Sequence, residues 1–161
     1  MIFKYTGLLL IAISISMYGT KKSSALINTY KIKLEIANLI KTIEHSVKFG
    51  AIPIDKALNS YSSPLLEKCG FLDLLRKGNS NTEEIKEVLM QAGYEDSEST
   101  CEFFSKIGKS CCCENELILC SKHLAIFEQT LKSDEKEVKE KAQLYKKLSL
   151  IISILTIIIF I

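Results

Sequence analysis

The sequence has 161 residues and an apolar content of 47%, which suits one domain of ordinary size with a packed core. Its net charge is only +2, and Arg76 is the one arginine. Proteins that bind nucleic acid usually carry dense patches of arginine and lysine, so the composition argues against a nucleic-acid partner. Much of the apolar content lies at the two ends of the chain, which is typical of membrane anchors.

The N-terminal segment, residues 3–19, lies almost wholly within an uncharged run from Tyr5 to Thr20. As a helix of about 17 residues it is roughly 25 Å long, close to the minimum for crossing a hydrocarbon core. A secretory signal peptide is the alternative, with Lys4 at its start. However, Met-Tyr-Gly-Thr at 17–20 lacks the small-residue pattern of a cleavage site. We therefore expect residues 1–21 to form an uncleaved transmembrane anchor.

The central segment, residues 22–147, shows helical periodicity and helix punctuation rather than alternation. An apolar stripe predicts one long helix over 25–49 that ends at Gly50, with Pro53 opening a short helix over 54–60. Ser63 and Pro64 predict the start of a further helix that runs to about 77 and ends at Gly78.

Two shorter helices are expected before the last long one. Ser80 and Glu83 have the spacing of a capping box for a helix that carries Ile85, Val88 and Leu89. A helix over about 98–107 is expected to bury its apolar side chains before Gly108, namely Phe103, Phe104 and Ile107.

A run of three cysteines follows Gly108, Lys109 and Ser110. A phosphate-binding loop would need glycine at 103, where phenylalanine stands, and a preceding strand. Adjacent cysteines on a helix point about 100° apart, which does not suit a zinc site. We expect Ser110 to cap the next helix and Cys111 and Cys112 to lie in its exposed first turn. The other four cysteines are expected in the core: Cys69, Cys101, Cys113 and Cys120.

The last soluble helix carries a heptad-like apolar stripe that is broken at Asp134 and shifted to Ala142. The stripe comprises Leu117, Cys120, Leu124, Phe127, Leu131, Val138, Tyr145 and Leu148. No glycine or proline separates it from the uncharged residues 148–161, which we expect to form a C-terminal transmembrane anchor beginning as early as 144.

The lysines indicate the orientation. Those beside the two anchors lie mainly on the central segment: Lys21, Lys22, Lys31, Lys33, Lys139, Lys141, Lys146 and Lys147. By the positive-inside rule the central segment faces the cytoplasm, where thiols normally stay reduced. The predicted fold is all-α, with two terminal transmembrane helices that flank a cytosolic helical bundle containing two long antiparallel helices.

The order of these parts resembles the stage III sporulation protein AB family of spore-forming Firmicutes. The resemblance rests on YKIKLEIANLIKTIEHSVKFG (30–50), on Gly-Ala-Ile-Pro-Ile (50–54) followed by Ala57 and Leu58, and on Phe104 followed by Gly-Lys-Ser (108–110). Ile52 replaces the usual threonine, Ile107 the usual leucine and Cys111 the usual aspartate.

The resemblance implies a non-enzymatic subunit of the channel between mother cell and forespore, located in the mother-cell outer forespore membrane. Its cytosolic domain would resemble those of type II secretion inner-membrane platform proteins. Its partners would be other stage III channel subunits and a cytosolic AA-type secretion ATPase. We expect docking around residues 50–58 and 108–112, with these candidates: Gly50, Pro53, Ala57, Leu58, Gly108 and Ser110.

The sequence nominates no catalytic, cofactor-binding or metal-binding residues and no small-molecule substrate. It contains no Ser/His/Asp or paired-carboxylate arrangement that would suggest an enzyme. The alternative to a scaffold is a membrane-tethered redox or metal sensor that uses Cys111, Cys112 and Cys120.

Overall fold

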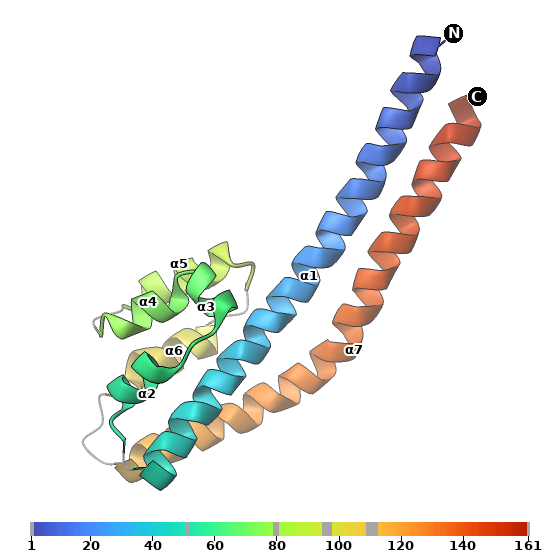
Figure 1. Ribbon diagram of the computed structural model, residues 1–161. Helices are drawn as coiled ribbons and strands as arrows, with labels where there is room; N and C mark the ends of the chain where they lie inside the picture. Colours follow the sequence, from blue (N-terminus) through green and yellow to red (C-terminus); the bar gives the residue numbers. More distant parts are fainter. Residues whose placement is uncertain (1, 51, 79–80, 95–97, 109–112, 161) are drawn as a thin grey trace. The chain divides into compact units, whose positions relative to one another are not determined.

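The computed structural model describes the backbone of residues 2–50, 52–78, 81–94, 98–108 and 113–160. Within these ranges every regular element is a helix, which confirms the all-α fold (Figure 1). The chain divides into two compact units. Unit 1 comprises Met1–Tyr30 with Ser133–Ile161, and unit 2 comprises Lys31–Lys132.

Unit 1 is a pair of antiparallel helical segments from α1 (Ile2–Gly50) and α7 (Cys113–Phe160), with both chain termini at one end (Figure 1). The sequence predicted an anchor and a separate helix over 25–49, but α1 is continuous through both. No proline interrupts residues 20–25, and the only glycine nearby, Gly19, lies inside the helix where the two segments meet. The serine hydroxyls in this region do not break the helix either.

Small side chains form the contact inside unit 1. Ser153 Oγ donates to the backbone oxygen of Ala12 at 2.8 Å and lies 2.9 Å from that of Ser149. The buried small residues along the two segments are Ala12, Gly19 and Ser23 on α1 and Ala142, Ser149 and Ser153 on α7. Close approach of two helices through small residues is typical of packing in membranes.

The apolar stripe predicted on α7 is partly confirmed. Cys120, Phe127, Leu131 and the shifted Ala142 are buried. Leu148 was predicted on the buried face but is 49% exposed, and its neighbour Ser149 is buried instead. The heptad count fails here because the packed face of this apolar segment is marked by small residues rather than by large ones.

Helix α7 is long and apolar enough to cross a membrane, as judged by its length and composition. Among the residues whose side chains the structure describes, it is the one such helix. The first predicted span begins at Phe3, whose side chain lies outside that set. A single candidate span is therefore established, and the second remains a proposal.

Unit 2 packs five short helices against the other segments of α1 and α7. These are α2 (Ile54–Ser60), α3 (Pro64–Lys68), α4 (Phe71–Arg76), α5 (Thr82–Gln91) and α6 (Glu98–Lys106). Most of the predicted stripe of α1 is buried in unit 2, with no exposed surface on Ile36, Leu39 or Ile43, whereas Leu34, also predicted in the stripe, is 41% exposed. The Phe71 and Phe104 rings pack edge-to-face with their centres 5.2 Å apart, and the centres of the Phe103 and Phe104 rings are 5.0 Å apart. These rings form the aromatic part of the core.

Two helix boundaries differ from the prediction. The helix expected over 64–77 is interrupted at Gly70, whose φ of +78° separates α3 from α4. A left-handed residue ends a helix, and glycine adopts this conformation without strain. Asn81 occupies the N-cap position of α5, while the predicted capping residue Ser80 lies outside the described residues. Ser63 does occupy the N-cap of α3, although its side chain makes no capping hydrogen bond.

Tyr61 and Arg76 tie the connection between α2 and α3 to neighbouring helices. Tyr61 Oη lies 3.1 Å from Glu35 Oε2 and 3.2 Å from the Glu35 backbone oxygen, both of which accept hydrogen bonds. Arg76 Nη2 donates to the backbone oxygen of Tyr61 at 2.7 Å. Burial, followed by the bond to the Glu35 carboxylate, raises the pKa of the Tyr61 hydroxyl. Hydrophobic periodicity and helix punctuation do not predict this cluster.

We expect the stability of unit 2 to fall at high pH because of Tyr61. A raised pKa in the folded state means that this contribution is complete below the unfolded pKa of about 10 and is lost as the pH rises above it. Tyr61→Phe should cost about 1 kcal/mol at neutral pH and reduce the alkaline loss. The full chain in micelles is unfolded with denaturant at neutral pH and again at high pH, and amide exchange monitors the unfolding. The two experiments give the stability at neutral pH and its loss at high pH. Tyr18→Phe, at a side chain that is 68% exposed, should change neither quantity.

Candidate functional site

Described residues of the two segments predicted to dock a partner line one cavity of unit 2. A cavity of about 100 Å³ lies between α2, the end of α4 and the end of α6. Leu58 from the first predicted segment and Gly108 from the second both line it. The remaining lining residues are Ile54, Asp55, Leu75, Gly78, Phe104, Ser105 and Ile107. Segments 50 residues apart in the sequence therefore share a surface, which we call the docking pocket.

The predicted docking residues play different parts around this pocket. Pro53 is the exposed N-cap residue of α2, and Gly50 is the last residue of α1. Ala57 and Leu58 are only 1% and 7% exposed, so their side chains hold α2 against the core and offer little surface to a partner. Ser110, both as a docking residue and as a helix cap, lies outside the described residues.

Gly108 follows the end of α6, as predicted, with a φ of +80°. Its backbone N–H donates to Glu116 Oε1 at 3.1 Å, and Glu116 is only 4% exposed. Glu116 lies in the first turn of α7, where a carboxylate is favoured by the helix dipole. This carboxylate joins the end of one helical region to the start of α7. Sequence reasoning missed it, although an acidic residue in a first turn was the available signal.

A second, larger hollow of about 300 Å³ lies between α6 and α7. His123 lines it and stacks on Phe103 with ring centres 4.5 Å apart. Burial lowers the pKa of His123. Its half-buried side chain lies at the boundary between the core and the surface. Removal of the ring from water therefore favours its neutral form in the folded chain.

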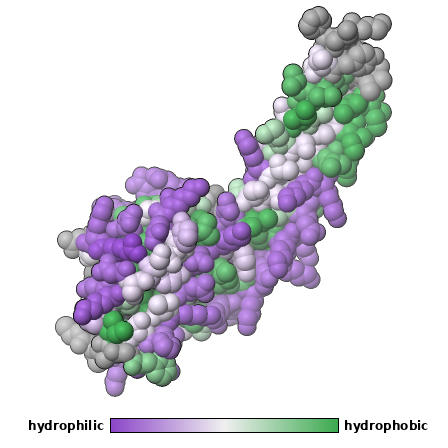
Figure 2. All heavy atoms as spheres, viewed as in Figure 1, coloured by the Kyte–Doolittle hydropathy of each residue, from purple (hydrophilic) through white to green (hydrophobic). Residues whose placement is uncertain are grey.

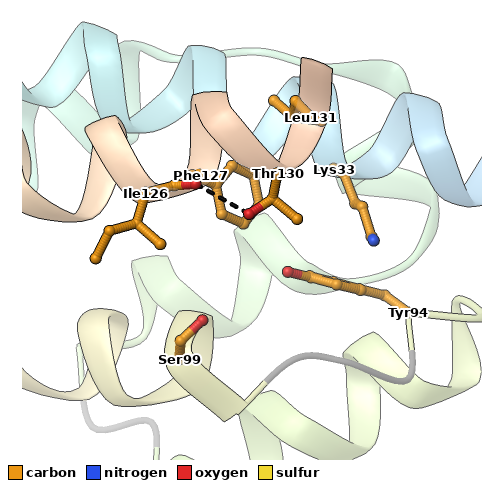
Figure 3. A pocket seen from close by; sticks show the side chains of 7 residues that line it. All are labelled: Lys33, Tyr94, Ser99, Ile126, Phe127, Thr130 and Leu131. Atoms are coloured by element: carbon orange, nitrogen blue, oxygen red, sulfur yellow. Dashed lines mark hydrogen bonds between the residues drawn. The ribbon is translucent and has the colours of Figure 1, made fainter. Parts of the chain in front are cut away.

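A third cavity lies where α6 and the chain segment after α5 face α1 and α7 (Figure 3). It has a volume of about 40 Å³, room for no more than a few water molecules. Lys33 Nζ lies 5.2 Å from the centre of the Tyr94 ring, and Tyr94 Oη is hydrogen-bonded to Thr100 Oγ1 at 3.0 Å. Its size suits a packing defect beside a cation–π contact rather than a ligand site.

The cysteines are placed largely as predicted where the structure describes them. Cys101 and Cys120 are each 1% exposed, and Cys69 is half-buried. Burial, followed by the nearby carboxylates of Glu116 and Glu44, raises the pKa of the Cys120 thiol to about 12. Cys111 and Cys112 lie outside the described residues, and Cys113 begins α7. Among the described residues, no cluster of three or more His, Cys, Asp or Glu side chains could hold a metal ion.

We expect Cys120 to resist alkylation in the folded protein. At pH 8 a thiol of pKa about 12 is ionised about a thousandfold less than an ordinary exposed thiol, and only the thiolate reacts. Mass spectrometry after iodoacetamide treatment, peptide by peptide, measures the rates. Denaturant should make all cysteines equally reactive. Fast labelling of Cys120 in the folded chain would contradict its burial and favour the cysteine sensor.

Compared with known proteins, the chain matches no family model, no curated protein and no solved structure.

Proposed function

We propose that this chain is a membrane-anchored helical scaffold whose unit 2 docks a cytosolic partner protein. The supporting observation is the uncovered apolar surface of unit 1. Large apolar side chains there are 42–74% exposed on the C-terminal part of α7, and those on α1 are 46–64% exposed (Figure 2). They are Leu148, Leu150, Ile151, Ile152, Ile154, Leu155, Ile158 and Ile159 on α7, and Leu9, Leu10, Ile11 and Ile13 on α1.

Lipid is the environment that suits such a surface. A soluble protein rarely leaves a continuous apolar patch of this extent in water, whereas helices in a bilayer expose large side chains and pack through small ones. The polar contacts of Ser149 and Ser153 are satisfied by helix backbone oxygens, as a membrane interior requires. In this proposal both segments of unit 1 span the membrane, so residues 1–21 and 148–161 are the anchors and residues 22–147 are cytosolic.

Anchoring is tested by expressing the full chain in a bacterium and extracting the membranes with alkaline carbonate. A protein with two transmembrane helices stays in the membrane fraction, whereas a peripheral protein is released. Cysteine-reactive reagents that do not cross membranes should label a cysteine added at either chain terminus. The same reagents should not label a cysteine that replaces Asn59 on the exposed face of α2. Release by carbonate, or labelling at Asn59 alone, would contradict the proposal.

The resemblance to the stage III sporulation protein AB family leads us to propose an AA-type secretion ATPase as the partner, in the channel between mother cell and forespore. The docking pocket is the surface we assign to it, because Leu58 and Gly108, from two of the three segments that carry the resemblance, line this pocket. Asp55 is exposed at its rim and offers a charged side chain that a partner can contact without disturbing the core.

Docking is tested by pull-down of the ATPase with the full chain in detergent. Asp55→Lys places a lysine at the pocket rim and should abolish capture. Glu83→Lys makes the same change of charge on exposed α5, away from the pocket lining, and should leave capture unchanged. Absence of capture by the unchanged chain would exclude this partner, and equal loss in both variants would exclude the pocket as the binding surface.

A further inference from the structure

Four lysines lie at one level of unit 1, beside the start of its apolar ends. A Cβ atom on Gly19 would lie 2.9 Å from the backbone oxygen of Tyr145, so these positions face each other across the helix pair. Lys21 and Lys22 follow Gly19 on α1, and Lys146 and Lys147 follow Tyr145 on α7. Lys22 Nζ lies 5.8 Å from the centre of the Tyr145 ring, which places Lys22 beside the residue that precedes Lys146. We call the four residues the lysine belt.

Carboxylates of the described residues do not compensate the charge of the belt. All four side chains are exposed, and no described carboxylate lies within ion-pair distance of any of them. The sequence contains no Asp or Glu before Glu35 or after Glu140. By contrast, the lysines one to three turns earlier on α7 are each paired with a glutamate of the same helix: Lys136 with Glu140, Lys139 with Glu135 and Lys141 with Glu137.

Tyrosines mark the same level. Tyr18 is 68% exposed one residue before Gly19, and Tyr145 is half-buried beside Lys22. Tyrosine and lysine side chains gather where hydrocarbon gives way to headgroups, because each joins an apolar stem or ring to a polar end. At the boundary between hydrocarbon and headgroups, exposed ammonium groups without an ion-pair partner meet the phosphate of a lipid headgroup.

We propose that the lysine belt is a binding site for anionic phospholipid headgroups, with the two pairs of lysines on α1 and α7 acting together. This inference rests on the membrane anchoring proposed above. Clusters of basic residues at the cytoplasmic end of transmembrane helices attract anionic lipid, each contributing about a fivefold factor when close to the surface. Four unpaired lysines on two adjacent helices concentrate that attraction, whereas the paired lysines earlier on α7 are already neutralised.

The test uses the full chain reconstituted in vesicles of phosphatidylcholine mixed with phosphatidylglycerol. The chain is extracted in mild detergent, and mass spectrometry measures the ratio of the two lipids that remain bound. We expect several-fold enrichment of phosphatidylglycerol over its bulk proportion, falling as salt is raised. Lys146→Gln with Lys147→Gln should lower the enrichment to near the bulk proportion. Lys21→Gln with Lys22→Gln should do the same.

The matched control is Lys139→Gln with Lys141→Gln, which removes the same charge from the same helix but only from lysines paired with glutamate. It should leave the enrichment unchanged, and arginine at all four belt positions should preserve it. An equal loss of phosphatidylglycerol enrichment in the control would contradict the lysine belt as a lipid site, while leaving the anchoring intact. The same conclusion would follow if a chain that resists carbonate extraction showed no enrichment. Displacement of the lipid by soluble glycerophosphate, but not by sulfate at equal ionic strength, would show a site for free phosphate instead. Release by carbonate would contradict the anchoring itself.

Discussion

Gly19→Ala is expected to force apart the two helical segments of unit 1. A Cβ atom at this position would lie 2.3 Å from Ser149 Cβ, 2.2 Å from Ser149 Oγ and 2.9 Å from the Tyr145 backbone oxygen. The hydroxyl can rotate away, but the Cβ atom and the backbone oxygen cannot, so the helices must separate. Overpacking of this kind costs about 1–3 kcal/mol, and leucine should cost more. The measurement is a titration of the full chain with SDS, in which amide exchange of residues 6–30 and 133–159 is followed. The variant should reach fast exchange in these residues at a lower fraction of SDS.

Gly7→Ala is the matched control on the same helix. A Cβ atom there would have no neighbour within 4 Å, so only the gain in helix propensity remains, up to about 1 kcal/mol. The two variants carry the same chemical change, and their difference isolates the packing at Gly19. Exchange within residues 64–106 should be the same in both, because the altered contact lies in unit 1. Equal behaviour of the two variants would show that the segments do not pack through Gly19.

Local punctuation predicted much of unit 2. Pro53 before α2, Pro64 opening α3 and Gly108 after α6 all stand where the sequence placed them, because the backbone preferences of proline and glycine act within a few residues. Gly70 was missed for a related reason. It lies within an apolar period that continues on both sides, and only its left-handed φ of +78° reveals that the helix stops there.

The packed face of unit 1 was not predictable from hydrophobic periodicity. Periodicity finds a buried face by the contrast between apolar and polar side chains, and an uncharged apolar segment offers little contrast. The face is instead recorded in small residues, as Ser149 and Ser153 show opposite Ala12 and Gly19. A search for small residues at spacings of four and seven would have favoured Ser149 over Leu148.

The docking pocket was predicted only as two separate segments. That Leu58 and Gly108 share one cavity depends on how α2 and α6 pack, which is a long-range property of the core. The contacts that fix this region, Tyr61 with Glu35 and Glu116 with the Gly108 backbone, each join residues distant in the sequence or in different elements. Hydrogen bonds of this kind leave no periodic signal in a single sequence.

Phe71→Ala is expected to destabilise unit 2 strongly, because Phe71 has no exposed surface and its ring packs against that of Phe104 in the aromatic core. Removing a buried phenylalanine ring costs about 3–5 kcal/mol through lost burial and the cavity left behind. The edge-to-face contact with Phe104 at 5.2 Å adds to this loss. The total is a large part of the 5–15 kcal/mol that stabilises a typical domain. The loss of stability is measured by the rate of amide exchange in residues 64–106 of the full chain. A loss of this size should raise that rate a hundredfold or more.

Phe49→Ala makes the same chemical change at a side chain that is 70% exposed, so its effect on exchange in 64–106 should be within about 0.5 kcal/mol of none. Phe71→Leu keeps most of the buried volume and should fall between the two. Because Phe71 belongs to unit 2, the exchange of the unit 1 segments should be the same in all three variants. Loss of protection in both units with Phe71→Ala would show that they unfold together, and an effect as small as that of Phe49→Ala would contradict the aromatic core.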